Sequence, residues 1–334
     1  MDGGLKKFHL VRFELNLLAK DTLLLPPYKG STFRGGFGHA FKRVACVLKD
    51  KECSECLLRS KCIYSYVFET PPPEDTHILR KYPTAPHPFI IEPPLDTRRL
   101  YEPGEELKFG LVLIGRAIDY LPYFIYTFEE LGRIGIGKGR GKYELREVRV
   151  EGRTRGGEGR EGRTGEVIYR GDTKTLSSKY RLITGHDLLV KEDSRIPHLG
   201  SRISLLFLTP TRLKYEESLT SELEFHILLR NLLRRISLLS YFHCGKRLEI
   251  DFRGMIEKAR KIRTRDRELK WVDWERYSAR QETRLKMGGF VGSITFEGEL
   301  EEFLPVLRLG ELVHVGKGTS FGLGQYRIES VEAL

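Results

Sequence analysis

The sequence lacks any long apolar run. No stretch of its 334 residues approaches the roughly 18 consecutive apolar residues of a membrane-spanning helix. The N-terminal segment alternates apolar and polar side chains as a β-strand does, and it lacks the apolar core of a secretory signal peptide. These absences argue against an integral membrane protein and predict a cytoplasmic protein with no membrane partner.

Two further motifs are absent. No helix-turn-helix pattern is present, which argues against a regulator that reads duplex DNA. The glycine-rich segments place lysine between glycines, with no Ser or Thr directly after it, so they are not Walker A loops. Positive charge, in contrast, is in excess: 57 Lys and Arg against 46 Asp and Glu give a net charge of +11 and a pI of about 9.3. This excess predicts a polyanionic partner.

Cysteine is scarce and unevenly distributed. Four of the five cysteines lie in one short segment, with the spacing C-x6-C-x2-C-x5-C: Cys46, Cys53, Cys56 and Cys62. In a basic chain without a signal peptide, such a cluster indicates metal ligation rather than disulfides. Four thiolates would hold a structural zinc ion and leave it no open position for catalysis. An iron-sulfur cluster, or small buried residues in an irregular loop, are the alternatives.

A polar segment divides the chain into two similar halves. Residues 151–165, "EGRTRGGEGREGRTG", carry no apolar side chain and predict a flexible linker or loop. On each side of it the chain shows an alternating strand, a helix containing Leu-Pro, a Gly-Lys-Gly loop (137–139 and 316–318) and a strand that carries tyrosine. This correspondence indicates an internal duplication.

The front of each half completes a β-α-β-β-α-β pattern. A strand precedes a helix over about 31–48 in the first half, and another strand precedes an amphipathic helix over 218–243 in the second. The predicted fold is therefore α+β, with tandem ferredoxin-like (RRM-like, split βαβ) domains and glycine-rich loops. The expected boundaries are a first domain over 1–150 with a cysteine knuckle at 46–62, the linker over 151–165, and a second domain over 166–334 with a basic insertion at 245–285.

The second half carries two features typical of nucleic-acid binding. The segment "VGKGTSFGLGQYR", 315–327, offers glycine backbone N–H groups and a lysine to an anion, although a merely tight connection would use the same residues. The segment 253–270 is strongly basic and leads to the aromatic residues Trp271, Trp274 and Tyr277. Cations beside aromatic rings can neutralise phosphates and stack unpaired bases.

These features resemble a known family. The terminal segment 274–328, with support from "FLTPTRLKYEE" and "GSTFRGGFGHAFKRVACVL", is similar to the CRISPR precursor-RNA processing endoribonucleases of the repeat-associated mysterious protein superfamily. The resemblance is to the variant with an N-terminal four-cysteine cluster. It implies cleavage of the CRISPR repeat without a metal, and RNA contact by the glycine-rich loop. The RNA-binding candidates are Gly316, Lys317, Gly318, Gly322, Gly324, Lys138, Arg34, Arg43, Arg212 and Arg280.

The candidate catalytic residues lie in the first half. If residues 31–48 are helical, the buried stripe consists of Phe33, Phe37, Phe41, Val44 and Leu48. His39 then points almost opposite Phe37, and Lys42 and Arg43 share its polar side. The resemblance implies His39 as acid or base, Tyr28 as its partner and Lys42 as the group that offsets charge on the phosphate, a role that Arg34 or Arg43 could also fill.

Glycine inside this helix is unfavourable. Gly35, Gly36 and Gly38 each cost about 1 kcal/mol relative to Ala. We therefore expect a backbone or a substrate to approach the helix closely there.

Two functions remain open at this point. The first is a metal-independent endoribonuclease that uses the ribose 2′-OH to cleave repeat RNA, leaves a 2′,3′-cyclic phosphate and needs no cofactor for catalysis. The second is a non-catalytic RNA-binding subunit of a CRISPR effector complex, since one fold can serve both roles. The expected partners are CRISPR repeat RNA, single-stranded or hairpin, and other CRISPR effector subunits, with the chain acting as a monomer or homodimer.

Overall fold

The structure is a computed structural model of the whole chain. It describes residues 5–48, 51–73, 76, 84–151, 165–189, 201–216, 218–220, 222–273, 275–278 and 283–333. Its contacts divide the chain into a first unit, His9–Ile183, and a second unit that combines Met1–Phe8 with Thr184–Leu334. Most of the expected linker lies outside the described residues. Strand β7 (Glu166–Arg170) pairs with β6 (Tyr143–Val150), so the chain after the expected linker still packs in the first unit.

The first unit has the topology of a ferredoxin-like domain with added strands. Its sheet runs in the order β3-β5-β1-β6-β7-β8 and all of these pairings are antiparallel. Together with α2 and α3 this gives β-α-β-β-α-β in the chain and the split βαβ order in the sheet. The elements up to β9, which crosses into the second unit, are β1 (His9–Ala19), β2 (Leu23–Leu24), α2 (Gly30–Ala45), η1 (Cys53–Glu55), η2 (Ser65–Glu69), β3 (Phe89–Glu92), β4 (Leu100–Tyr101), β5 (Glu106–Ile114), η3 (Gly115–Tyr120), α3 (Leu121–Ile134), β6, β7, β8 (Thr175–Leu176) and β9 (Ile183–Thr184).

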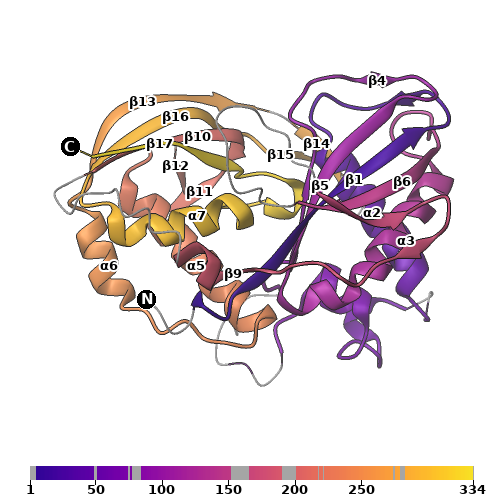
Figure 1. Cartoon of the computed structure of the whole chain (residues 1–334), viewed down its shortest axis with the longest axis horizontal. Helices are drawn as coiled ribbons and strands as arrows, with labels where there is room; N and C mark the ends of the chain where they lie inside the picture. The colour runs from indigo at the N-terminus through magenta and orange to yellow at the C-terminus, as the bar shows by residue number, and fades with distance from the viewer. Residues whose placement is uncertain are drawn as a thin grey trace. The chain divides into compact units, whose positions relative to one another are not determined.

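The second unit repeats the same topology. Its four-stranded sheet has the order β13-β16-β10-β17, again antiparallel throughout. The helices α5, α6 and α7 lie on one face of this sheet (Figure 1). The elements are α4 (Gly185–Leu189), β10 (Ser201–Thr211), β11 (Leu213–Tyr215), β12 (Ser218–Thr220), α5 (Phe225–His243), α6 (Phe252–Ala259), β13 (Arg263–Val272), β14 (Glu275–Ser278), β15 (Thr283–Lys286), β16 (Gly289–Gly298), η4 (Glu301–Phe303), α7 (Leu304–Val313), η5 (Thr319–Phe321) and β17 (Tyr326–Ala333).

The predicted α+β fold and the internal duplication are thus confirmed in detail. Both Leu-Pro pairs stand at helix starts, where proline fits because the first turn has no intrahelical use for its N–H. The segment 245–285 differs from the expected insertion, because β13 is the second strand of the ferredoxin-like core. No helix in the described part of the chain is long and apolar enough to span a membrane.

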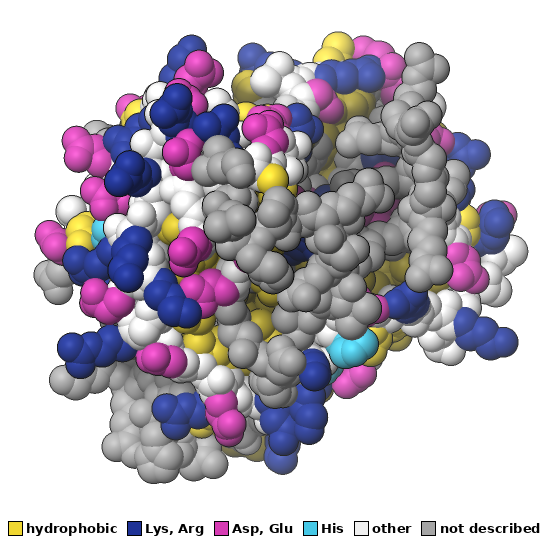
Figure 2. All heavy atoms as spheres, turned by 60° about the vertical axis from the view of Figure 1, so that its left-hand side comes forward, with side chains coloured by type: hydrophobic (Ala, Val, Ile, Leu, Met, Phe, Trp, Pro, Cys, Tyr) yellow, Lys and Arg dark blue, Asp and Glu magenta, His cyan; other side chains and the backbone are white. Residues whose placement is uncertain are grey.

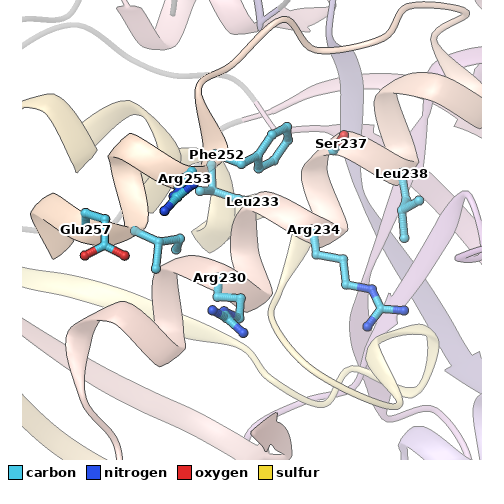
Figure 3. A pocket seen from close by; sticks show the side chains of 9 residues that line it. Arg230, Leu233, Arg234, Ser237, Leu238, Phe252, Arg253 and Glu257 are labelled. Carbon is cyan, nitrogen blue, oxygen red and sulfur yellow. The ribbon is translucent and has the colours of Figure 1, made fainter. Parts of the chain in front are cut away.

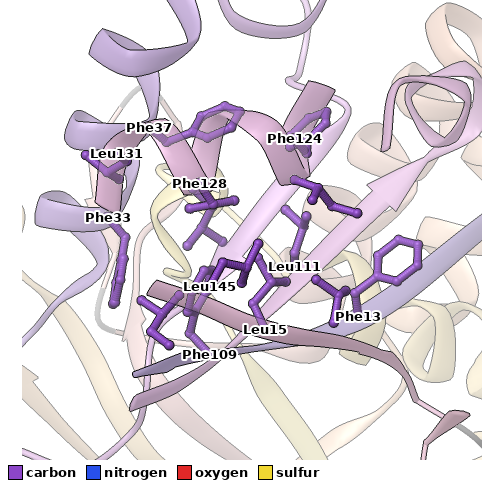
Figure 4. Close-up of a cluster of buried hydrophobic side chains, with 14 of the residues drawn as sticks. Phe13, Leu15, Phe33, Phe37, Phe109, Leu111, Phe124, Phe128, Leu131 and Leu145 are labelled. Carbon is purple, nitrogen blue, oxygen red and sulfur yellow. The ribbon is translucent and has the colours of Figure 1, made fainter. Parts of the chain in front are cut away.

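Aromatic packing anchors α2 to the sheet of the first unit. Phe33, Phe37 and Phe41 recur every four residues and are fully buried. Figure 4 shows Phe33 and Phe37 within the hydrophobic cluster. The Phe37 ring lies 5.1 Å from the ring centres of both Phe124 and Phe128 on α3. Rings of this size bury the largest apolar area per residue, so this face of α2 is held firmly and its opposite face is left to solvent. The helix ends at Ala45, three residues before the expected end.

Candidate functional site

Helix α2 presents His39 on its exposed side. Phe37 and Phe41 on either side of it point into the core, and His39 is exposed. Lys42 follows by three residues and is half-buried, and Arg43 follows by four and is exposed. Residues at these spacings are neighbours on a helix surface. The structure therefore brings an imidazole and two cations onto one stretch of α2.

The three side chains differ in what else they bind. Neither His39 nor Lys42 forms a hydrogen bond or an ion pair with another residue in the part of the chain that the structure describes. The Arg43 Nη2 atom, in contrast, lies 3.5 Å from Oε1 of Glu130 on α3. His39 and Lys42 are therefore the pair that a ligand can engage without breaking an existing contact.

Tyr28 lies at the other end of the helix. Its side chain is half-buried, and burial raises the pKa of its hydroxyl, so the group stays protonated. From Gly30 to His39 the helix rises about 14 Å at 1.5 Å per residue. Tyr28 is thus separated along the helix axis from the His39–Lys42 pair.

Lys29, which the sequence did not single out, anchors the start of α2. It is fully buried, and its Nζ donates to the carbonyl oxygen of Asp96 at 3.0 Å and lies 3.1 Å from Asp96 Oδ1. Burial acts to raise the pKa of the Asp96 carboxyl, but the hydrogen bonds from Lys29 and the Arg98 backbone outweigh it and the pKa is lowered. The "PPYKGST" segment contains no pattern that predicts an ion pair between Lys29 and Asp96, because Asp96 lies 67 residues further along the chain.

The three glycines of α2 have different surroundings. A Cβ added at Gly38 would lie 2.1 Å from the Phe68 ring, and one at Gly36 would lie 3.0 Å from Leu131. These two positions are close approaches of the protein to itself. At Gly35 a Cβ would meet nothing within 4 Å. Gly35 is one turn before His39 on the same side, so it leaves open space beside the candidate pair.

Arg34 is held by residues that the sequence left unassigned. Its guanidinium carbon lies 3.9 Å from the centre of the Phe68 ring. Its Nη2 lies 3.2 Å from His87 Nε2. His87 appeared in the sequence only as one histidine in a proline-rich stretch, because no local pattern pairs it with a residue 53 positions earlier.

The glycine-rich loop that follows α7 uses its backbone internally. The N–H of Lys317 donates to Arg212 O at 3.0 Å, and that of Gly324 donates to Pro210 O at 3.2 Å. The N–H of Gly322 donates to Thr319 O at 2.8 Å. These N–H groups are therefore not available to wrap an anion in this conformation.

The loop's glycines are required by its own shape. Gly316, Gly318, Gly322 and Gly324 have φ between 73° and 84°, which favours glycine. A Cβ on Gly324 would lie 1.8 Å from Val315 O, and one on Gly316 would lie 2.5 Å from Arg212 O. The loop is a compact structural turn. A ligand in solvent can therefore contact its side chains, but not the backbone N–H groups that bond within the protein.

Two cations stand at this loop. Lys317 is exposed. Arg212 is half-buried, and in the described residues its guanidinium meets only the Met287 sulfur, at 3.2 Å from Nη1, while its Nε has no hydrogen-bond partner. Burial lowers the pKa of Arg212. A half-buried guanidinium that has no anionic partner among the described residues would be stabilised by a phosphate, which could accept its hydrogen bonds and balance its charge.

The first unit contains the matching loop. The N–H of Lys138 donates to Leu24 O at 2.9 Å, as the N–H of Lys317 donates to Arg212 O in the second unit. Gly137 and Gly139 again have positive φ, of 76° and 85°. Lys138 is exposed. The duplication thus extends to single backbone hydrogen bonds, and both loops present one lysine to solvent.

The cysteine cluster is only partly gathered. Burial raises the pKa of the Cys53 thiol, nearby Lys42 opposes this, and Glu69 and the thiols of Cys46 and Cys62 add to the increase. Within the described residues no group of three or more His, Cys, Asp or Glu side chains is placed to hold a metal ion. As they stand, the four thiols do not fit a closed tetrahedral site.

Charge and cavities do not by themselves mark the site. Figure 2 shows Lys and Arg side chains interspersed with Asp and Glu over the face that it draws. A pocket of about 600 Å³ lies between α5 and α6 in the second unit (Figure 3). None of the described residues that the sequence predicted for the site lines this pocket. One predicted RNA-binding residue, Arg280, lies outside the described residues. The pocket is lined by Arg230, Leu233, Arg234, Ser237, Leu238, Phe252, Arg253, Ile256 and Glu257.

Comparison with known proteins adds independent information. A family model for an N-terminal domain, AF_1859_N, matches residues 8–180, and the model for the CRISPR-associated endoribonuclease Cas6 matches residues 205–326. An uncharacterized protein of Archaeoglobus fulgidus is 26% identical over 310 residues, which cover 92% of this chain and 93% of that protein.

Solved structures agree on the fold. A Cas6 structure from Thermus thermophilus aligns with 96% of this chain and 98% of its own, at 15% identity and a TM-score of 0.53. A partial Cas6-RT-Cas1–Cas2 complex aligns over 96% of this chain and 46% of its own, at 14% identity and a TM-score of 0.56. At these identities the structures bear on fold alone, and the family models bear on kinship. The AF_1859_N model covers more than half of the chain, so the chain belongs to the family of proteins that carry this N-terminal domain, and its second half is similar to the CRISPR-associated endoribonuclease Cas6.

Proposed function

We propose that this chain binds the CRISPR repeat in precursor transcripts and cleaves it, in the cytoplasm, to release guide RNAs. The observation that carries the proposal is the state of His39. It is exposed on α2, it has no hydrogen bond or ion pair with any described residue, and Lys42 is its neighbour one turn on. An exposed imidazole that no described residue engages can reach a bound RNA and exchange a proton with it.

The reaction needs only groups that the chain and the RNA possess. The ribose 2′-oxygen attacks the adjacent phosphorus, its proton passes to a base, and the P–O5′ bond breaks as the departing oxygen gains a proton. His39 serves as the acid or the base, and Lys42 offsets the negative charge that develops on the phosphorus centre. The products are a 2′,3′-cyclic phosphate and a 5′-hydroxyl. No step requires a metal, so we expect cleavage in the presence of a chelator.

Side chains at the two glycine-rich loops supply RNA contact. Lys317 and Lys138 are exposed, and Arg212 lacks an anionic partner among the described residues. Because the loops use backbone N–H groups internally, we assign phosphate contact to these cations rather than to the glycine backbone.

The test uses the repeat RNA of the CRISPR array in the genome that encodes this chain. Wild-type protein in EDTA should cut it once per repeat, a single 2′-deoxy substitution at the cut position should block cleavage, and His39→Ala should slow it by about a hundredfold or more. Binding without cleavage by the wild-type protein would instead support the non-catalytic RNA-binding subunit. Light scattering of the same sample, with and without RNA, separates monomer from homodimer.

Zinc at the cysteines is a separate proposal. The thiols of Cys46 and Cys62 lie near enough to Cys53 to influence its pKa, which supports partial convergence on a metal, although the placement of the four thiols does not complete a site. Metal analysis of protein purified without chelator tests this proposal. One zinc ion per chain that is lost in Cys53→Ser would support a zinc site at the four cysteines, and the absence of zinc from the wild-type protein would overturn it.

A further inference from the structure

A side-chain cluster beside α2 holds Arg34 in one orientation. The guanidinium lies against the Phe68 ring, and its Nη2 lies 3.2 Å from Nε2 of His87. His87 Nδ1 lies 2.7 Å from Thr70 Oγ1. The cluster therefore joins α2 to the end of η2 and to the residue that stands two positions before β3.

The direction of these hydrogen bonds favours one tautomer of His87. A guanidinium only donates, so His87 Nε2 must accept from Arg34. The Thr70 hydroxyl donates to Val67 O at 3.2 Å, so its oxygen accepts the Nδ1–H of His87. Neutral His87 with its proton on Nδ1 satisfies both contacts. A proton on Nε2 would point at the Arg34 cation, and Nε2 could then no longer accept a hydrogen bond from it.

The support behind His87 is rigid. Thr70 is buried and adopts a left-handed conformation with φ of 49°, and its backbone N–H donates to Ser65 O at 2.7 Å. Its carbonyl accepts from Ala85 N–H at 2.8 Å. Phe68, on which Arg34 stacks, is pressed against α2 at Gly38. A non-glycine residue with positive φ, held by three hydrogen bonds, keeps His87 from drifting.

We propose that His87 is a positioning residue, which holds the Arg34 guanidinium in place to contact a phosphate of the bound RNA. The inference rests on the proposed function. A guanidinium has five N–H groups and can bind His87 and a phosphate together. Arg34 and Lys42 are eight residues apart, about 12 Å along the axis of α2, so one RNA strand along this side of the helix reaches both. Without His87, a long and flexible side chain would have to be ordered at each binding event.

The test measures binding of the repeat RNA, made resistant to cleavage by a 2′-deoxy nucleotide at the cut position. Arg34→Ala and His87→Ala should each weaken the affinity about tenfold, and the double variant should bind no more weakly than Arg34→Ala. Glutamine can place its amide oxygen near the position of Nε2, whereas asparagine reaches only the position of Nδ1. We therefore expect His87→Gln to restore affinity to within about twofold and His87→Asn to leave it low.

The matched pair separates positioning from folding. Glutamine and asparagine carry the same amide group, so a fold defect common to both cannot produce a difference between them. At saturating RNA, cleavage of the unmodified repeat by His87→Ala should proceed at the wild-type kcat, with the loss confined to KM. Additive losses in the double variant, or equal affinities for the Gln and Asn variants, would overturn the role of His87. Failure of the wild-type protein to bind the RNA would overturn the proposed function instead.

Discussion

Helices α2 and α5 hold the same place in the two ferredoxin-like units, yet they use histidine and cations in opposite ways. On α2, His39 is exposed and Lys42 has no hydrogen bond or ion pair with a described residue. On α5, His226 is buried, its Nδ1 lies 3.1 Å from Glu224 Oε2, and its burial lowers its pKa. Arg235 is also buried there and donates to Val313 O at 2.7 Å. The two units share one fold, but they differ in these helices. On α2 the imidazole of His39 is available to a ligand, whereas on α5 His226 and Arg235 are bound to other residues of the protein.

The burial of Arg235 shows how far this division goes. Loss of solvent lowers the pKa of its guanidinium to about 9, and its Nε bonds a carbonyl at the C-terminal end of α7. A cation at that end of a helix is stabilised by the helix dipole. Arg235 is buried and therefore stabilises the helix that leads into the second glycine-rich loop.

The largest expected effect comes from replacing each of the two helix histidines, His39 and His226, with alanine. His39→Ala should slow cleavage of repeat RNA by about a hundredfold or more and leave the thermal midpoint unchanged, because the side chain is exposed and supports no packing. His226→Ala should lower the free energy of unfolding by about 1–3 kcal/mol and leave kcat unchanged, because a buried, partnered group is removed. Single-turnover cleavage and thermal unfolding measure both. Equal loss of activity in the two variants would break the contrast between the helices.

The glycines of α2, which α5 lacks entirely, give the next effect. Gly38→Ala places a methyl group against the Phe68 ring and should cost about 1–3 kcal/mol of stability. Gly35→Ala meets nothing and should stabilise the helix by up to about 1 kcal/mol. If open space at Gly35 serves RNA, the stabilised variant should also bind repeat RNA more weakly. Chemical denaturation and RNA titration test the two statements separately, and a Gly35→Ala variant with unchanged affinity would leave that space without a role.

The two cations beside His39 should differ in a smaller way. Lys42→Ala should reduce the cleavage rate at saturating RNA by about tenfold, since a charge near the phosphorus centre is removed. Arg43→Ala should reduce it by no more than about threefold, because its guanidinium already pairs with Glu130. The ratio of the two rates under one set of conditions is the measurement. An Arg43 effect larger than the Lys42 effect would transfer the stabilising role to Arg43.

The sequence was sufficient for the fold and insufficient for the contacts that hold the site. Period-two and period-3.6 patterns predicted both ferredoxin-like units, and the spacing of Phe33, Phe37 and Phe41 placed the buried face of α2 correctly. The second-half helix was predicted to begin too early, because Leu219 fits a helical stripe but lies in β12, where hairpin pairing with β11 prevails.

Contacts that link distant segments left no local signal. Lys29 with Asp96, and Arg34 with His87, are each separated by more than fifty residues, and only the assembled fold brings them together. The glycines of the second loop were expected to free the backbone for an anion. Instead their positive φ values let the loop bond to itself, a choice that composition alone does not distinguish.

The smallest expected effect compares the two loop lysines. Lys317 and Lys138 hold equivalent positions, both exposed, with the same backbone hydrogen bond to the strand-end segment of their own unit. Only the second-unit loop also has Arg212 beside it, whose guanidinium lacks an anionic partner among the described residues. Lys317→Ala should therefore weaken RNA binding about threefold and reduce the slope of log affinity against log salt by about 0.7, the value for one lost contact to a single strand. Lys138→Ala should change both by less. Titrations over a range of salt concentrations decide it: equal slopes for the two variants would mean that RNA contacts both loops alike, and the units would then differ in their helices alone.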